Sequence, residues 1–203
     1  QRGLTIAEQR SLRRHVAMRF DDRGNGAMLS LDDSRNLTYA SLAPDDDRPP
    51  VVMSTAPGQR QPSIAYHAPN KAISVWVENA LTPSQLQALD TNGYSSSGFP
   101  IAVRNQRLAW SKFNGSTWSP KQFLTLPGNG EAFPVLEACP DGTAGCPVGG
   151  SVFLAFQRNI NGNFIAPRNR IFHATWSASS GLSALTQTPA GAGATQDITP
   201  SVV

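Results

Sequence analysis

The chain has 203 residues, of which 39% are hydrophobic and 15% are charged, and its formal net charge is +3. This composition excludes a disordered chain and a coiled coil, and the length suits one domain with a sizeable core. No apolar run approaches the roughly 20 residues of a membrane span. The lysines and arginines are scattered except for Arg10, Arg13 and Arg14, whereas nucleic-acid binders gather basic charge on one face. We therefore expect neither a membrane span nor a nucleic-acid partner.

The first residues predict a short helix. Thr5 is followed by Glu8, which is the spacing of a helix capping box. We expect a helix from about Ile6 to Arg14, inside an N-terminal helical segment of residues 1–14. Beyond it, the 17 glycines and 16 prolines of the chain favour many turns and short strands over long helices.

Residues 21–32, "DDRGNGAMLSLD", have a spacing that resembles the calcium loop of an EF-hand. Asp21, Asn25 and Asp32 would be ligands in such a loop, but Arg23 places a cation where an oxygen ligand is expected. The same residues also suit a hairpin that turns at residues 24–26, and we favour this alternative. The three residues are therefore weak metal candidates, and apart from calcium we expect no cofactor.

Two later segments predict β-hairpins. Residues 63–79, "SIAYHAPNKAISVWVEN", have Pro-Asn between two apolar runs. Residues 107–126, "RLAWSKFNGSTWSPKQFLTL", have Asn114 and Gly115 in that place. Asn-Gly between apolar runs is the strongest short hairpin signal, because both residues tolerate a positive φ.

The third strands of the predicted units recur along the chain. Nine-residue segments that begin at Ser34, Asn105 and Arg168 align without gaps, and bulky residues fall in two columns. The columns contain Tyr39, Trp110 and His173, and three places later Leu42, Phe113 and Trp176.

Other strands precede and follow these segments in the same order, with second strands that begin at Ala27, Ala72 and Ser151. The unit is therefore four strands. Repeats of about 40–70 residues with four strands each are typical of propeller blades. We expect one partial propeller domain, residues 15–203, with an insertion at residues 81–100. Its blades span about 15–57, 58–127 and 128–189, and the first strand of a further blade spans 198–203.

Cys139 and Cys146 stand in the segment "CPDGTAGC". The short, turn-rich interval suits a disulfide that closes the loop between the first two strands of the third blade. A metal site would need further ligands nearby, and no His or other Cys flanks this loop. A disulfide implies an oxidising compartment, so we expect a secreted or cell-surface protein. The alternative is two free thiols in a cytosolic loop.

The hairpin at residues 107–126 resembles the Asp-box, or BNR, motif of sialidase-like β-propellers. The motif is Ser-x-Asp-x-Gly-x-x-Trp, and Ser111, Gly115 and Trp118 fit it, while Phe113 stands where the aspartate should be. The resemblance implies an all-β fold of four-stranded antiparallel propeller blades, about three blades and one extra strand after the short N-terminal helix. The tryptophans lie on the apolar columns, so we expect Trp110 and Trp118 to be packing residues.

Sialidase chemistry, as the resemblance implies it, uses three arginines on the substrate carboxylate, a Tyr–Glu nucleophile pair and an acidic acid/base. Arg19 is a lone arginine on an expected inner strand, so we name no catalytic residue and expect no catalysis by this chain alone. We interpret the chain as an extracellular recognition module that binds glycan or protein through propeller loops. The alternatives are part of a secreted glycosidase or polysaccharide lyase completed by another chain, and a purely structural domain.

Three blades form an open arc, whereas closed propellers use about four to eight blades. The sequence ends at "TPSVV", inside an expected strand. We therefore expect a second polypeptide to supply the remaining blades. A homodimer of two arcs is the weaker alternative, because it leaves the extra strand unexplained.

Overall fold

A computed structural model describes residues 16–32, 34–43, 46, 48–56, 59–90, 98–125, 130–160 and 168–189. These residues form three antiparallel sheets and two helices. The first sheet contains β1 (Ala17–Phe20), β2 (Gly26–Leu31), β3 (Leu37–Ser41) and β4 (Val51–Ser54). The second contains β5 (Arg60–Ala68), β6 (Lys71–Asn79), β7 (Gln106–Phe113) and β8 (Gln122–Phe123). The third contains β9 (Glu131–Cys139), β10 (Ser151–Asn159), β11 (Asn169–Ser177), β12 (Gly181–Leu182) and β13 (Thr186–Gln187).

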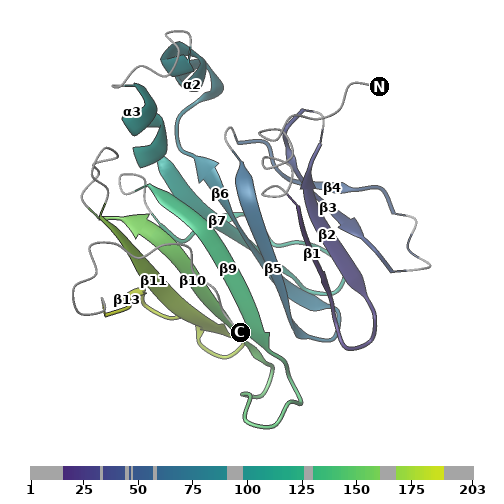
Figure 1. Cartoon of the computed structure of the whole chain (residues 1–203). Helices are drawn as coiled ribbons and strands as arrows, with labels where there is room; N and C mark the ends of the chain where they lie inside the picture. The colour runs from purple at the N-terminus through teal and green to yellow at the C-terminus, as the bar shows by residue number, and fades with distance from the viewer. Residues whose placement is uncertain are drawn as a thin grey trace, which may run out of the picture.

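Each sheet is a meander in which consecutive strands are neighbours. In the third sheet the fourth position is shared by β12 and β13, which both pair with β11. Strand β1 contacts β5 and β5 contacts β9, so the first strands of the sheets lie side by side in Figure 1. Three four-stranded sheets arranged in this way confirm the predicted fold class of all-β, propeller-like blades. The expected helix at residues 6–14 and the expected strand at 198–203 lie outside the described residues.

The core consists of two layers of side chains, one between each pair of neighbouring sheets. The layer between the first and second sheets is centred on Leu29, Leu37 and Trp76, all fully buried. The layer between the second and third sheets is centred on Leu108 and Phe156, which are also fully buried. Burying one such side chain contributes about 1.5–3 kcal/mol, so these layers hold the three sheets together.

The position of a sheet in the stack explains the hydrophobic pattern of its strands. Strand β6, in the middle sheet, is buried at eight consecutive residues after Lys71, because sheets cover both of its faces. In β1, by contrast, the burial pattern is mostly exposed, and Met18 and Phe20 are 51% and 54% exposed. These two side chains lie on the face of the first sheet that is turned away from the second.

The aligned columns of the third strands correspond to equivalent positions in the structure. The residues of the first column are Tyr39, Trp110 and His173. Each of them pairs across strands with one residue of the second strand and one residue of a fourth strand in its own sheet. The pairs are Tyr39 with Leu29 and Val51, Trp110 with Val75 and Gln122, and His173 with Ala155 and Thr186. The second strands, predicted to begin at Ala27, Ala72 and Ser151, begin at Gly26, Lys71 and Ser151. Their starts do not define a common register, because the second-strand partners stand two, three and four residues after the predicted starts.

The predicted hairpin after β7 is present, but its turn is longer than a two-residue Asn-Gly turn. Phe113 and Trp118 form a β-bridge, and the Asn114 amide donates to the Thr117 carbonyl at 3.2 Å. The Asn114 carboxamide oxygen also accepts from the amides of Ser116 and Thr117, both at 2.9 Å. Within this turn the positive φ falls on Gly115, at 104°. The side chain of Asn114 thus organises the turn instead of its backbone.

The expected insertion contains two helices that the sequence analysis did not predict, α2 (Pro83–Asp90) and α3 (Gly98–Arg104). Thr82 and Gln85 form a capping box at the start of α2, with hydrogen bonds of 2.8 and 3.2 Å. Pro83 occupies the first helical position, where its missing N–H costs nothing. Among the described residues, no helix is long and apolar enough to cross a membrane.

Candidate functional site

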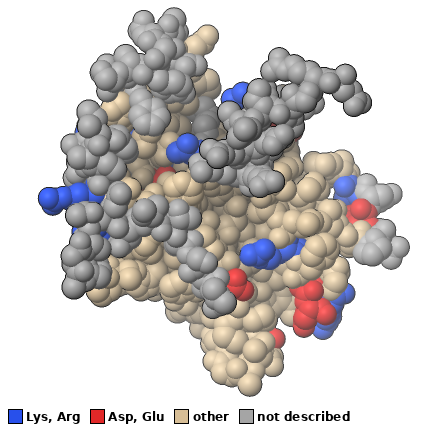
Figure 2. All heavy atoms as spheres, viewed as in Figure 1, with Lys and Arg blue, Asp and Glu red and all other residues tan. Residues whose placement is uncertain are grey.

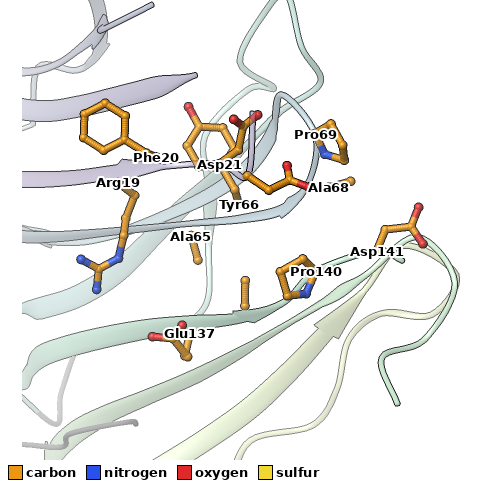
Figure 3. A pocket seen from close by; sticks show the side chains of 12 residues that line it. Arg19, Phe20, Asp21, Ala65, Tyr66, Ala68, Pro69, Glu137, Pro140 and Asp141 are labelled. Atoms are coloured by element: carbon orange, nitrogen blue, oxygen red, sulfur yellow. The ribbon is translucent and has the colours of Figure 1, made fainter. Parts of the chain in front are cut away.

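A cavity of about 160 Å³, which we call the axial cavity, lies where the first strands of the three sheets end. It is enclosed by β1, β5 and β9 and by the turns that follow them (Figure 3). In Figure 1 these turns, including the long loop after β9, lie at the end of the molecule opposite α2 and α3. The lining residues are Arg19, Phe20, Asp21, Asp22, Ala65, Tyr66, Ala68, Pro69, Glu137, Ala138, Pro140 and Asp141.

Asp21 supports the turns at this cavity with both carboxylate oxygens. Oδ1 accepts from the amides of Arg23 at 2.9 Å and Asn25 at 2.8 Å. Oδ2 accepts from the Asn25 carboxamide and from the Asn70 amide of the next blade, both at 2.9 Å. Burial alone would raise the pKa of Asp21, but these hydrogen bonds, led by that of Asn25, hold it below its ordinary value. Asp21 is therefore an ionised structural anchor between the first two blades.

The other charged groups of the axial cavity are spread across it. Figure 3 shows Arg19 and Glu137 at one end of the cavity and Asp141 at the other. Glu137 is exposed, and the Asp141 carboxylate accepts from the Gly149 amide at 2.9 Å. Burial raises the pKa of Tyr66, so its hydroxyl stays protonated and can donate or accept a hydrogen bond. The cavity thus offers separate cationic, anionic and phenolic groups to a polar ligand.

The predicted disulfide between Cys139 and Cys146 is present, with Cα atoms 5.4 Å apart. It closes the loop between β9 and β10, as expected. The loop is also fastened to the second sheet, because the Asp141 amide donates to the His67 carbonyl at 2.8 Å. A Cβ atom at Gly150, where φ is 71°, would collide with that carbonyl, so only glycine fits there. Burial lowers the pKa of the His67 imidazole, whose Nδ1 lies 3.0 Å from the Gly149 carbonyl oxygen.

A second cavity, which we call the rim cavity, lies between the outer parts of the first and second sheets and measures about 430 Å³. One wall is formed by the rings of Tyr39, Phe113 and Trp118, whose centroids lie 5.2–5.4 Å apart. The remaining lining residues are Ser41, Arg48, Pro49, Val51, Val52, Met53, Ser111, Ser116, Thr117, Ser119, Pro120 and Lys121. This cavity is thus formed by the first two blades, whereas all three blades line the axial cavity.

Beside the rim cavity, the fully buried carboxylate of Glu78 joins the first two sheets. Its oxygens accept from Lys121 at 3.0 and 3.2 Å, from Arg107 at 3.1 Å and from the Ser54 hydroxyl at 3.1 Å. The Trp76 indole donates a fifth hydrogen bond at 3.3 Å. The carboxylate is therefore compensated by two cations from β7 and the segment before β8.

A second buried carboxylate, Glu131, lies at the start of β9, at the other end of that strand from the axial cavity. Its Oε1 accepts from the Arg158 guanidinium at 2.9 Å, while Oε2 has no hydrogen-bond partner within the described part of the chain. Burial raises the pKa of Glu131 to about 7, because the attraction of Arg158 only partly offsets the loss of water.

The structure separates the weak calcium candidates. Asp21 and Asn25 share the turn before β2, whereas Asp32 follows the far end of β2 and supports the next turn. The Asp32 carboxylate accepts from the amide and the carboxamide of Asn36, at 2.8 and 3.0 Å. Residues 26–31 form a strand in place of a calcium loop, which agrees with the favoured hairpin. No cluster of three His, Cys, Asp or Glu side chains suited to a metal occurs among the described residues.

Trp110 and Trp118, the two tryptophans of the hairpin at residues 107–126, are both packing residues, but they are buried to different degrees. Trp110 is 9% exposed in the layer between the second and third sheets. Trp118 is partly buried and contributes to the wall of the rim cavity. The sequence analysis missed Glu78, Glu131 and Glu137; a signal for Glu78 was its place at the end of the apolar run of β6.

On the face shown in Figure 2, blue and red atoms occur in small groups, some of both signs, within a mostly tan surface. A ligand that binds on this face would therefore interact with individual charged side chains, because the described residues form no large area of one charge sign there to attract it.

Comparisons with known proteins give a fold similarity only. No protein-family model matches the chain, and no curated protein matches it in sequence. Among solved structures, it is similar to an α-L-arabinanase of Penicillium chrysogenum that was solved with arabinobiose. The TM-score is 0.49 at 12% identity, over 91% of this chain and 50% of the arabinanase chain. The chain thus spans half the length of that structure, and a similarity this distant does not extend to activity.

Proposed function

We propose that the chain is a secreted or cell-surface recognition module that binds glycan or protein through propeller loops. The observation that carries this proposal is the axial cavity, because loops of three blades converge there and present Arg19, Tyr66 and Glu137 together. Concave sites with a few convergent polar groups are where proteins bind ligands. The disulfide between Cys139 and Cys146 supports the extracellular location.

The roles of the carboxylates favour binding over hydrolysis. A glycosidase typically needs two carboxyl groups that flank the bond, one with a raised pKa as the acid. In the axial cavity Asp21 supports a turn and has a lowered pKa, and Asp141 holds the cysteine loop. The remaining carboxylates of the cavity, Asp22 and Glu137, are both exposed, whereas burial is what raises the pKa of a catalytic acid.

We further propose that residues 15–203 are part of a larger propeller whose remaining blades come from a second polypeptide. The outer face of the first sheet supports this, because Met18 and Phe20 are half exposed there. On the outer face of the third sheet, Phe153 is 36% exposed. Apolar side chains on two sheet faces suit further sheets as neighbours. Size-exclusion chromatography with light scattering on the native material tests this; a stable 21.7 kDa monomer would contradict it.

The recognition function is tested with a glycan array and a hydrolysis screen on the native assembly. Arg19→Ala and Glu137→Gln are the informative variants, because both side chains line the axial cavity and are not buried. We expect each to weaken ligand binding about tenfold while the melting temperature is unchanged. Lys112→Met, a distant exposed cation, is the control. Release of reducing sugar that depends on Glu137 would instead favour the alternative, a glycosidase completed by another chain.

A further inference from the structure

The rim cavity lies between the first and second sheets, and the cavity between the second and third sheets is much smaller. The two aligned columns place Tyr39 and Phe113 between the first and second sheets, and Trp110 and Trp176 between the second and third. Between the latter two sheets, the cavity that Trp110 and Trp176 line measures only about 10 Å³. Between the first and second sheets, where the rings of Tyr39 and Phe113 are smaller than an indole, the rim cavity leaves about 430 Å³ open. The larger volume is in the range of small-molecule sites.

The apolar wall of this cavity is rigid. Phe113 is 3% exposed and Tyr39 is 6% exposed, so the fold fixes both rings. The Trp118 ring packs edge-on against Tyr39, with the centroids 5.2 Å apart. A ligand that stacks on this wall would not need to order the rings first, which lowers the free-energy cost of binding.

The lining of the cavity is also rich in hydroxyl groups. Ser41, Ser111, Ser116, Thr117 and Ser119 all line it. The Ser111 hydroxyl is held in place because it donates to the Ser119 carbonyl at 2.7 Å. Oriented hydroxyl groups accept hydrogen bonds from a ligand that itself carries hydroxyl groups.

The two cations of the cavity are already neutralised. Arg48 forms a bidentate pair with Asp46, at 2.6 and 2.7 Å. Lys121 uses its three N–H groups on Glu78 and Ser54, at 3.0–3.3 Å. A charged ligand would lose water without gaining a free counter-charge, so the lining favours a neutral ligand.

We propose that the rim cavity is a binding site for a neutral oligosaccharide, with one sugar ring stacked on Trp118 and its hydroxyl groups hydrogen-bonded to the serine and threonine hydroxyls of the lining. The proposal rests on the proposed recognition function and names a ligand class and a second site for it. A sugar combines an apolar ring face with hydroxyl groups and carries no charge, which matches the three features above. A peptide is the weaker occupant, because its backbone amides need a strand edge, and β4, the edge strand that lines the cavity, is only four residues long.

The test uses the native assembly labelled with 5-fluorotryptophan, whose four tryptophan resonances are followed by fluorine NMR. The Trp118→Phe variant assigns the Trp118 signal. The probes are maltose, cellobiose, lactose and mannobiose, with glucuronic acid and a proline-rich peptide as competitors of other classes. We expect at least one neutral disaccharide to shift the Trp118 signal and leave that of fully buried Trp76 unchanged.

The deciding variant is Val51→Phe, which adds volume inside the cavity from a residue that is 50% exposed, so the fold is retained. We expect it to weaken disaccharide binding about tenfold or more. Val148→Phe, the same change at a 92% exposed position on the cysteine loop, is the matched control and should have no effect.

Three results would overturn the proposal, each in a different way. Sugar binding that Arg19→Ala abolishes and Val51→Phe does not affect would reject the rim site and keep the recognition function. A Trp118 shift with the peptide or with glucuronic acid alone would reject the ligand class. Binding of neither sugars nor protein by the native assembly would reject the recognition function itself.

Discussion

Replacing Glu78 should test whether the buried carboxylate joins the first two blades. Its side chain is fully buried, while those of its partners Lys121 and Arg107 are 28% and 23% exposed. Removing one member of a buried ion pair costs about 3–5 kcal/mol, because the remaining charge loses its compensation. We expect Glu78→Ala to cost that much. Glu78→Gln keeps the shape and one acceptor, so it should cost about 1.5–3 kcal/mol.

The assay is urea unfolding followed by tryptophan fluorescence, since Trp76 donates to this carboxylate and reports on its surroundings. A double-mutant cycle with Lys121→Met separates the ion pair from the loss of volume. We expect a coupling energy of about 1–2 kcal/mol, in the range of residues that share one network. Lys112→Met, an exposed lysine outside the network, should change stability by less than about 0.5 kcal/mol. A Glu78→Gln protein as stable as the wild type, with no coupling to Lys121, would refute this account.

Three further predictions follow from the other described contacts. Intact-mass measurement under non-reducing, alkylating conditions should find no free thiol at Cys139 or Cys146, and their replacement by Ser should cost at most about 2–3 kcal/mol; two alkylated thiols would reject the bridge. Trp110→Ala should lower the free energy of unfolding by about 3–5 kcal/mol, and an unchanged urea midpoint would contradict its burial. Burial raises the folded-state pKa of Glu131 from 4.5 to about 7, so the contribution of this group to stability should be fully present below about pH 4.5 and be lost, by about 3 kcal/mol, as the pH rises from there through 7. Glu131→Gln should remove that fall in a series of thermal melts, and an identical pH profile would disprove the assignment.

The third strands were predictable because their bulky residues repeat with a fixed spacing. Tyr39, Trp110 and His173 are equivalent in cross-strand pairing, as the alignment without gaps indicates. The starts of the second strands were predicted to within one residue, but not their register with the third strands, because a periodicity of two gives no unique register where both faces are buried. In β6 every residue after Lys71 is buried, so the pattern contains no polar position that would fix the alignment.

The helices of residues 81–100 were missed although a local signal was present. Thr82, Pro83 and Gln85 combine a capping box with proline at the first helical position. The turn after Phe113 was predicted as a hairpin, but the side-chain acceptor of Asn114 made it longer than the backbone preference of Asn-Gly implies. In both cases the side-chain hydrogen bond, which the pattern of apolar residues does not record, decided the local structure.

The candidate sites depend on distances between sheets, and this is why the sequence could not reveal them. Inner strands such as β1 and β5 are in contact, whereas the outer parts of the first and second sheets leave the rim cavity open. The size of the space between two neighbouring sheets depends on the side chains of the aligned columns and on the charged groups beside them. Between the second and third sheets, the indole rings of Trp110 and Trp176 line a cavity of only about 10 Å³. Between the first and second sheets, the rings of Tyr39, Phe113 and Trp118 form one wall of a cavity of about 430 Å³. The sequence indicates which aromatic residues lie in each layer, but the volume that they leave open depends on how the two sheets pack.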